Sequence, residues 1–178
     1  MNKLLAATFV ALLMVGCGEI GNLLAPEVQM IPPLSEEQEK IIAEAIRIEF
    51  RVEKGEELAY APNEQTPYTG WSKSMYGNGQ ISALTEWKDG EVHGLELAWY
   101  TPNEKKNGKY VCIMKSAKTW QDGKQMSAAI WKPNGEKCPH TNLVDGNGVE
   151  VVYNDDGTES HRLTYKDGVR VHRKWPPK

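Results

Sequence analysis

The sequence predicts a mainly β protein, an antiparallel meander of β-hairpins that forms an elongated twisted sheet and follows one short N-terminal helix. An aromatic residue recurs just before Asn-Gly or Asp-Gly, and these dipeptides suit hairpin turns because both residues accept a positive φ at low cost. Such turns recur at intervals of roughly a dozen residues, as expected for short strands joined by tight turns. Six tryptophans and seven tyrosines against two phenylalanines also favour a pleated surface. The predicted turns are Asn78-Gly79, Asp89-Gly90, Asp122-Gly123, Asn134-Gly135, Asp156-Gly157 and Asp167-Gly168.

The chain begins with the pattern of a bacterial lipoprotein signal. Lys3 precedes an apolar run over residues 4–15, which is too short to cross a bilayer comfortably and fits a signal-peptide core. Small residues then precede Cys17, and this resembles the lipobox, although Met14 stands where leucine is usual. We predict that residues 1–16 are removed and that Cys17 carries fatty acyl chains, palmitate among them, that anchor the protein in a membrane. The alternative is an ordinary secretory signal with an unmodified cysteine.

The residue after the cysteine bears on localisation. By resemblance to enterobacterial sorting, Gly18 rather than aspartate favours the outer membrane, with the domain facing the periplasm or the cell surface. Retention in the inner membrane stays open. The predicted location of the protein is therefore the bacterial cell envelope.

Four regions follow the signal: a flexible tether at 17–34, an N-terminal helix at 35–55, a β domain at 56–173 and a tail at 174–178. The helix is predicted from a capping box that starts at Ser35 and from apolar residues at helical spacing between 41 and 48. A rival pattern overlaps its end, because Ile46, Ile48, Phe50 and Val52 alternate with charged residues as they would in a strand.

The strands of the β domain are predicted from alternating apolar residues between the turns. Leu95, Leu97 and Trp99 fall on one face of a strand and are expected to point the same way. The longest irregular stretch is 137–147. The predicted strands are 58–61, 71–76, 81–88, 95–100, 110–120, 126–131, 149–153, 161–166 and 169–171.

Residues 86–100, which contain Gly90, His93 and Gly94, resemble the MORN repeat with its Gly-x-x-His-Gly step. Residues 68–71, including Gly70, resemble its opening, and the Asn-Gly segments resemble the bacterial MORN-variant repeat. The resemblance implies a MORN-like hairpin array over roughly residues 58–172, with the turn residues in structural roles. Chains of this type are frequently labelled as antitoxin components of toxin–antitoxin systems, many carry lipoprotein signals, and members are described as interaction modules.

The sequence contains no pattern that predicts catalysis. The histidines form no HExxH pair, and neither a Gly-x-Ser-x-Gly elbow nor a phosphate loop occurs. We expect no enzyme activity, no cofactor and no metal site; a weak alternative places His161 and His172 together on adjacent strands as metal ligands. The net charge of −3 and the lack of a basic stripe argue against binding to nucleic acid.

Two groups of side chains leave alternatives open. Cys112 and Cys138 could form a disulfide in an oxidising envelope, or remain two separate thiols. Most aromatic residues are expected to pack between strands, while Trp99, Trp120 and Trp131 are candidates for an exposed binding face.

The leading functional prediction is a non-enzymatic, membrane-anchored lipoprotein whose sheet binds another protein of the envelope. The first alternative is an antitoxin or immunity protein that neutralises a toxin. The second is a peripheral binder of lipid or cell-wall glycan.

Overall fold

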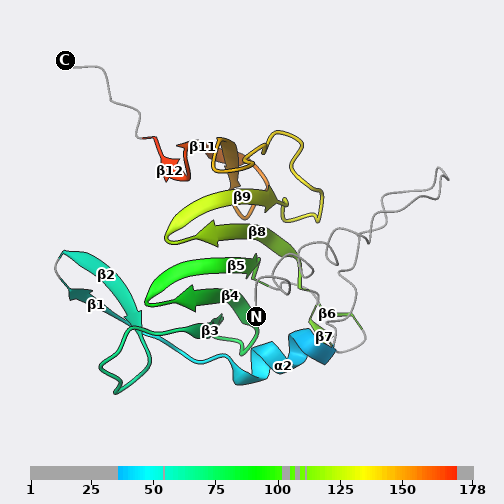
Figure 1. The fold of residues 1–178 in the computed structure, drawn as a ribbon. Coiled ribbons are helices and arrows are strands. Elements are labelled where there is room, and N and C mark those ends of the chain that lie inside the picture. The colour runs from blue at the N-terminus through cyan, green and yellow to red at the C-terminus, as the bar shows by residue number, and fades with distance from the viewer. Residues whose placement is uncertain (1–35, 54, 102–104, 107–108, 111, 172–178) are drawn as a thin grey trace, which may run out of the picture.

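The computed structural model describes residues 36–53, 55–101, 105–106, 109–110 and 112–171 (Figure 1). The signal, Cys17, the tether at 17–34 and the tail at 174–178 therefore lie outside the described residues. The described part is mainly β, with antiparallel hairpins and one short helix, as the sequence predicts. The prediction of one elongated sheet is wrong, because the hairpins form separate sheets of two, five, two and three strands. Its elements are α2 (Glu36–Glu44), β1 (Glu49–Glu53), β2 (Glu56–Tyr60), β3 (Gly70–Met75), β4 (Ile81–Lys88), β5 (Glu91–Trp99), β6 (Lys105–Lys106), β7 (Lys109–Tyr110), β8 (Met114–Gln121), β9 (Lys124–Ile130), β10 (Gly148–Tyr153), β11 (Glu159–Lys166) and β12 (Val169–Arg170).

A five-stranded antiparallel sheet in the order β3-β4-β5-β8-β9 forms the centre of the molecule (Figure 1). Each strand pairs with its neighbour in the chain, except that β5 pairs with β8 across the segment that holds the short β6–β7 pair. The register places Leu84 opposite Leu97, and Leu97 opposite Ala117. Apolar side chains of three strands therefore gather on one face.

The prediction of a helix over 35–55 is wrong beyond Glu44. Residue Ala45 is buried, Ile46 bridges to Ser72 of β3, and the chain then enters β1. The alternating pattern that begins at Ile46 prevails because β1 can pair with β2 across the turn at Gly55, where φ is +90°. Lys73 fixes the end of α2 to β3 by donating a hydrogen bond of 2.7 Å from Nζ to the Ile42 carbonyl.

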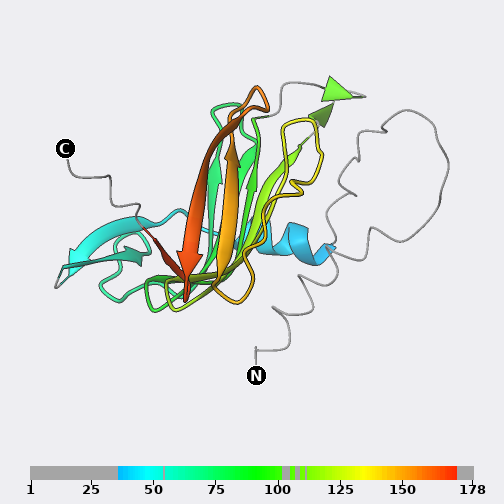
Figure 2. The same ribbon diagram turned by 90° about the horizontal axis from the view of Figure 1, so that it is seen from above.

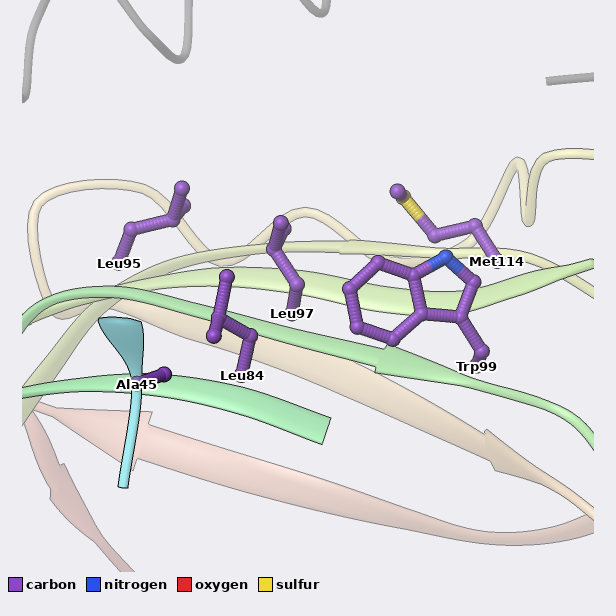
Figure 3. Close-up of a cluster of buried hydrophobic side chains, with 6 residues drawn as sticks. All are labelled: Ala45, Leu84, Leu95, Leu97, Trp99 and Met114. Carbon is purple, nitrogen blue, oxygen red and sulfur yellow. The ribbon is translucent and has the colours of Figure 1, made fainter. Parts of the chain in front are cut away.

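The main hydrophobic cluster lies on one face of the five-stranded sheet, and its strand residues point to the same side of that sheet (Figure 3). The alternation of β5 brings Leu95, Leu97 and Trp99 together there, as predicted. The end of α2 adds Ala45 to this cluster. The buried members are Ala45, Leu84, Leu95, Leu97, Trp99 and Met114.

A second sheet, β10-β11-β12, continues the molecule beyond β9, and Figure 2 shows β10 and β11 side by side. The irregular stretch after β9 links the two sheets: Cys138 donates its N–H to the Ile130 carbonyl, and Asn142 donates to the Val149 carbonyl. A smaller cluster of Ile130, Cys138, Val151 and Tyr153 fills the junction. The stretch expected to be an irregular loop therefore lies between β9 and β10 and forms backbone hydrogen bonds with both.

Candidate functional site: a recurring turn unit and a buried ion pair

The turn between β4 and β5 has a specific pattern of hydrogen bonds. Asp89 and Gly90 take φ values of +52° and +84°, as a two-residue hairpin turn requires. The Asp89 N–H donates to Thr69 Oγ1 at 2.9 Å, and the Gly90 N–H donates to the Tyr68 carbonyl at 2.9 Å. The turn is thus held by two consecutive residues just before β3.

The turn between β8 and β9 has the same arrangement. Asp122 and Gly123 have φ values of +49° and +71°. The Asp122 N–H donates to His93 Nδ1 at 3.3 Å, and the Gly123 N–H donates to the Val92 carbonyl at 3.1 Å. The same His93 nitrogen lies 3.2 Å from the Asp122 carboxylate, but a ring nitrogen that accepts the N–H has no proton to donate, so the bond from the N–H is the contact that fixes the turn.

The turn between β11 and β12 repeats the arrangement a third time. The Asp167 N–H donates to Asn147 Oδ1 at 3.2 Å, and the Gly168 N–H donates to the Gly146 carbonyl at 2.9 Å. In all three cases the side-chain acceptor directly precedes a glycine of positive φ. Those glycines are Gly70, Gly94 and Gly148.

The remaining predicted turns share a second pattern. In each, the side-chain oxygen of the Asn or Asp accepts the backbone N–H two residues later, and the following glycine takes a positive φ. The distances are 3.0 Å for Asn78 with Gln80, 3.0 Å for Asn134 with Glu136 and 2.8 Å for Asp156 with Thr158. The glycines are Gly79, Gly135 and Gly157. All six predicted turn pairs therefore lie at turns, three of each kind.

The sequence interpretation assigned a turn role to His93 but missed Thr69 and Asn147. Both accept the N–H of an aspartate that lies 20 residues further along the chain. The signal that could have found them is their position before Gly70 and Gly148, which matches the position of His93 before Gly94.

A buried ion pair lies on the other face of the five-stranded sheet, where β10 approaches β8 and β9. Lys118 Nζ lies 2.8 Å from Glu150 Oε1, with 17% and 4% of the two side chains exposed. Gln125 Nε2 donates to the other Glu150 oxygen at 2.6 Å. Burial raises the pKa of the neighbouring Glu96 carboxyl, and Lys118 only partly opposes this. The pair joins the two sheets, since Lys118 belongs to the first and Glu150 to the second.

The three candidate binding tryptophans do not form an exposed face. Trp99 is 4% exposed and belongs to the main cluster, so its assignment to a binding surface is wrong. Trp131 is half-buried and packs against the same cluster. Trp120 is half-buried, and its Nε1 atom is buried. The packing alternative therefore describes Trp99 and Trp131.

The structure leaves Cys112 and Cys138 as free thiols in different surroundings, so it contradicts the disulfide. Cys112 packs against the main cluster, whereas Cys138 is buried in the junction between the sheets. Burial opposes ionisation of Cys138, but hydrogen bonds from Thr141 and Tyr153 outweigh it and hold the pKa below its usual value. The same contact with Cys138 raises the pKa of Tyr153 to about 12.

The other expectations concern metals, membranes and known proteins. Among the described residues, no three His, Cys, Asp or Glu side chains gather in a way that could hold a metal ion; His161 is exposed on β11, and His172 lies outside the described range. In the part of the chain that the structure describes, no helix has the length and apolar character needed to span a membrane. A comparison with protein-family models, curated proteins and solved structures finds no match for this chain.

Proposed function

We propose that this protein is a non-enzymatic lipoprotein, anchored in the bacterial envelope through Cys17, whose MORN-like sheet binds another protein. The observation that carries the proposal is the turn unit that recurs at Asp89, Asp122 and Asp167 with the same two hydrogen bonds. A unit that recurs in this way supports the repeat interpretation, because stacked hairpins bury their core only against one another. Repeat arrays present long surfaces that suit binding of a macromolecule.

The second unit is longer than the other two, and this supports an inserted segment within a repeat rather than an unrelated fold. Its histidine and its aspartate are 29 residues apart, against 20 in the first and third units. The additional residues fall between β5 and β8, around the short β6–β7 pair. The insertion lies at the ends of β5 and β8, and these two strands still pair with each other.

Two other functions rest on the same anchor and sheet. As an antitoxin or immunity protein, this chain would neutralise a toxin at the membrane, and a cognate toxin gene beside its own gene would support that role. As a peripheral binder, it would recognise lipid or cell-wall glycan directly. We favour a protein partner because the resemblance to MORN repeats carries that role.

Membrane attachment is tested by the substitution Cys17→Ser. If acyl chains provide the anchor, the wild-type protein fractionates with membranes and the variant moves to the soluble fraction. Substitution of the buried Cys138 by serine, which leaves the lipobox intact, serves as the matched control and stays with the membrane. A Cys17→Ser variant that still fractionates with membranes would show that another contact holds the protein there.

The lipid or glycan alternative is tested by sedimentation of the Cys17→Ser chain with liposomes and with peptidoglycan. The protein-binding proposal predicts that the variant stays in the supernatant in both cases. Direct co-sedimentation with either material would favour the peripheral binder instead.

A further inference from the structure

The β1–β2 hairpin projects from the body of the molecule and carries exposed apolar side chains on one strand (Figure 1). Phe50 is 56% exposed and Val52 is 70% exposed. Within the described residues, β1 pairs only with β2, so its second edge is open. Open edges of this kind pair readily with another strand.

The direction of the backbone groups on this edge follows from β2. The Ala59 N–H donates to the Gly90 carbonyl at 2.9 Å, and its carbonyl accepts the Tyr68 N–H at 2.8 Å. The backbone N–H and C=O groups of Ala59 therefore point away from β1, and those of its neighbours Leu58 and Tyr60 point toward β1. These two residues are opposite Arg51 and Glu49.

It follows that the N–H and C=O groups of Phe50 and Val52 point to the open edge. An added strand would therefore form its hydrogen bonds with these two residues. Such pairing would leave the bonds between β1 and β2 intact.

The charges along this strand are self-complementary. In an extended chain, Arg47, Glu49, Arg51 and Glu53 fall on one face and alternate in sign, while Ile48, Phe50 and Val52 fall on the other. Arg47 and Ile48 directly precede β1, and within one copy Arg51 contacts Glu49 at 3.3 Å and the Glu64 carbonyl at 2.7 Å. When the strand is placed antiparallel to a copy of itself with Phe50 opposite Phe50, every arginine lies opposite a glutamate. Ile48 then lies opposite Val52 of the second copy. A second copy of the chain therefore supplies both the charge pairs and the apolar pairs, and this complementarity favours it as the occupant of the edge.

We propose that β1 is a self-association edge through which two copies of this protein pair as antiparallel strands about Phe50. The product is a continuous four-stranded sheet in the order β2-β1-β1-β2. The proposal does not depend on lipidation or on a protein partner, because it rests on the edge geometry and charge pattern alone.

The sharpest test uses Arg47 and Glu53, which are roughly 20 Å apart along one extended chain and cannot contact each other within a copy. In the proposed dimer, Arg47 of one copy lies opposite Glu53 of the second copy, and Glu53 of the first copy lies opposite Arg47 of the second. Sedimentation velocity of the full chain in detergent should show a concentration-dependent dimer. Arg47→Glu alone and Glu53→Arg alone should each weaken the dimer about tenfold or more, because they place like charges opposite one another.

Rescue of dimerisation by compensating charge reversals distinguishes strand pairing from a general effect of surface charge. The double variant Arg47→Glu with Glu53→Arg should dimerise like the wild type, and an equimolar mixture of the two single variants should form a heterodimer. Val52→Pro, which removes an outward N–H that the monomer does not use, should give a monomer with an unchanged melting temperature. A wild-type chain that stays monomeric, or single reversals that are not rescued by each other, would overturn the proposal.

Discussion

At the scale of single residues, the fold depends on side chains that accept the N–H of an aspartate in a distant turn. Thr69, His93 and Asn147 perform this role in the three units although they differ in chemistry. What they share is one acceptor atom at the end of a short side chain. The position thus requires an acceptor rather than a particular residue type.

This equivalence gives a direct prediction for His93. The substitution His93→Ala should lower the free energy of unfolding by about 1 kcal/mol, because the Asp122 N–H loses its acceptor. His93→Asn should retain most of the stability, because Asn147 performs the same role in the third unit. Urea denaturation of the three proteins measures the difference. Equal losses for alanine and asparagine would show that the hydrogen bond is not what the position contributes.

Substitution of two turn glycines by alanine distinguishes the cost of backbone strain from the cost of a side-chain clash. Gly94 and Gly123 have φ values of +76° and +71°, so alanine costs about 1 kcal/mol at either from the backbone alone. At Gly94 a Cβ would also collide with the Glu86 carboxylate, whereas at Gly123 the nearest atom is 3.9 Å away.

We therefore expect Gly94→Ala to destabilise the protein by about 3 kcal/mol and Gly123→Ala by about 1 kcal/mol. To make room, the Glu86 carboxylate would have to give up the hydrogen bond of 3.2 Å that it accepts from the Leu95 N–H. Thermal unfolding of the two variants measures the difference. Similar melting temperatures would mean that Glu86 adjusts at little cost.

At the scale of elements, the two sheets meet at a mostly buried group of charges. Lys118 and Glu150 compensate each other at 2.8 Å, but Glu96 shares the same lysine and is the second carboxyl there. Burial raises its pKa, so the charged form of Glu96 opposes folding. This penalty is present above the folded-state pKa and absent below the ordinary carboxyl pKa, where Glu96 is protonated in both states.

Glu96→Gln should therefore stabilise the protein at neutral pH, and the gain should disappear as the pH falls below the ordinary carboxyl pKa. Glu57→Gln, at an exposed position on β2, serves as the control and should change little. Urea unfolding at pH 7.5 and under acidic conditions measures both variants. A loss of stability at neutral pH would mean that Glu96 is needed as a charged partner of Lys118.

Elements differ in how far the sequence determines them. The Asp-Gly and Asn-Gly turns are local, since the dihedral angles they need are set by two residues, and all six predicted pairs lie at turns. Asp145-Gly146, with φ values of +48° and +76°, forms a further turn inside the stretch expected to be irregular. The end of α2 could not be decided locally, because Ile42 fits a helical pattern and Ile48 a strand pattern, and only pairing with β2 and β3 resolves the conflict. The link between β9 and β10 is held by backbone bonds without a sequence pattern.

The sequence likewise predicts only part of the candidate site. Strand parity correctly placed Trp99 with Leu95 and Leu97, but parity alone does not say which face is covered. Parity therefore leaves Trp99 a candidate for a binding surface, whereas the structure places it in the core. The two missed acceptors, Thr69 and Asn147, act on turns far along the chain, and the sequence pattern shows no such contact by itself.

At the scale of the whole molecule, the structure is a row of hairpins with two different ends. One end is close to α2 and the projecting β1–β2 hairpin, and the other is β12 (Figure 1). The anchor that we propose would attach the first end to the membrane, because Cys17 precedes α2 in the chain. The row of hairpins would then present its surface to the surrounding compartment.

We propose that this surface binds a protein of the envelope, and chemical crosslinking in native envelopes would detect such binding where it occurs. Tagged full-length protein is crosslinked, purified and analysed by mass spectrometry, with the Cys17→Ser variant as a control for location. We expect one dominant co-purifying protein that is lost or strongly reduced with the variant. Recovery of only lipid, cell-wall fragments or background proteins would contradict it and favour the peripheral binder.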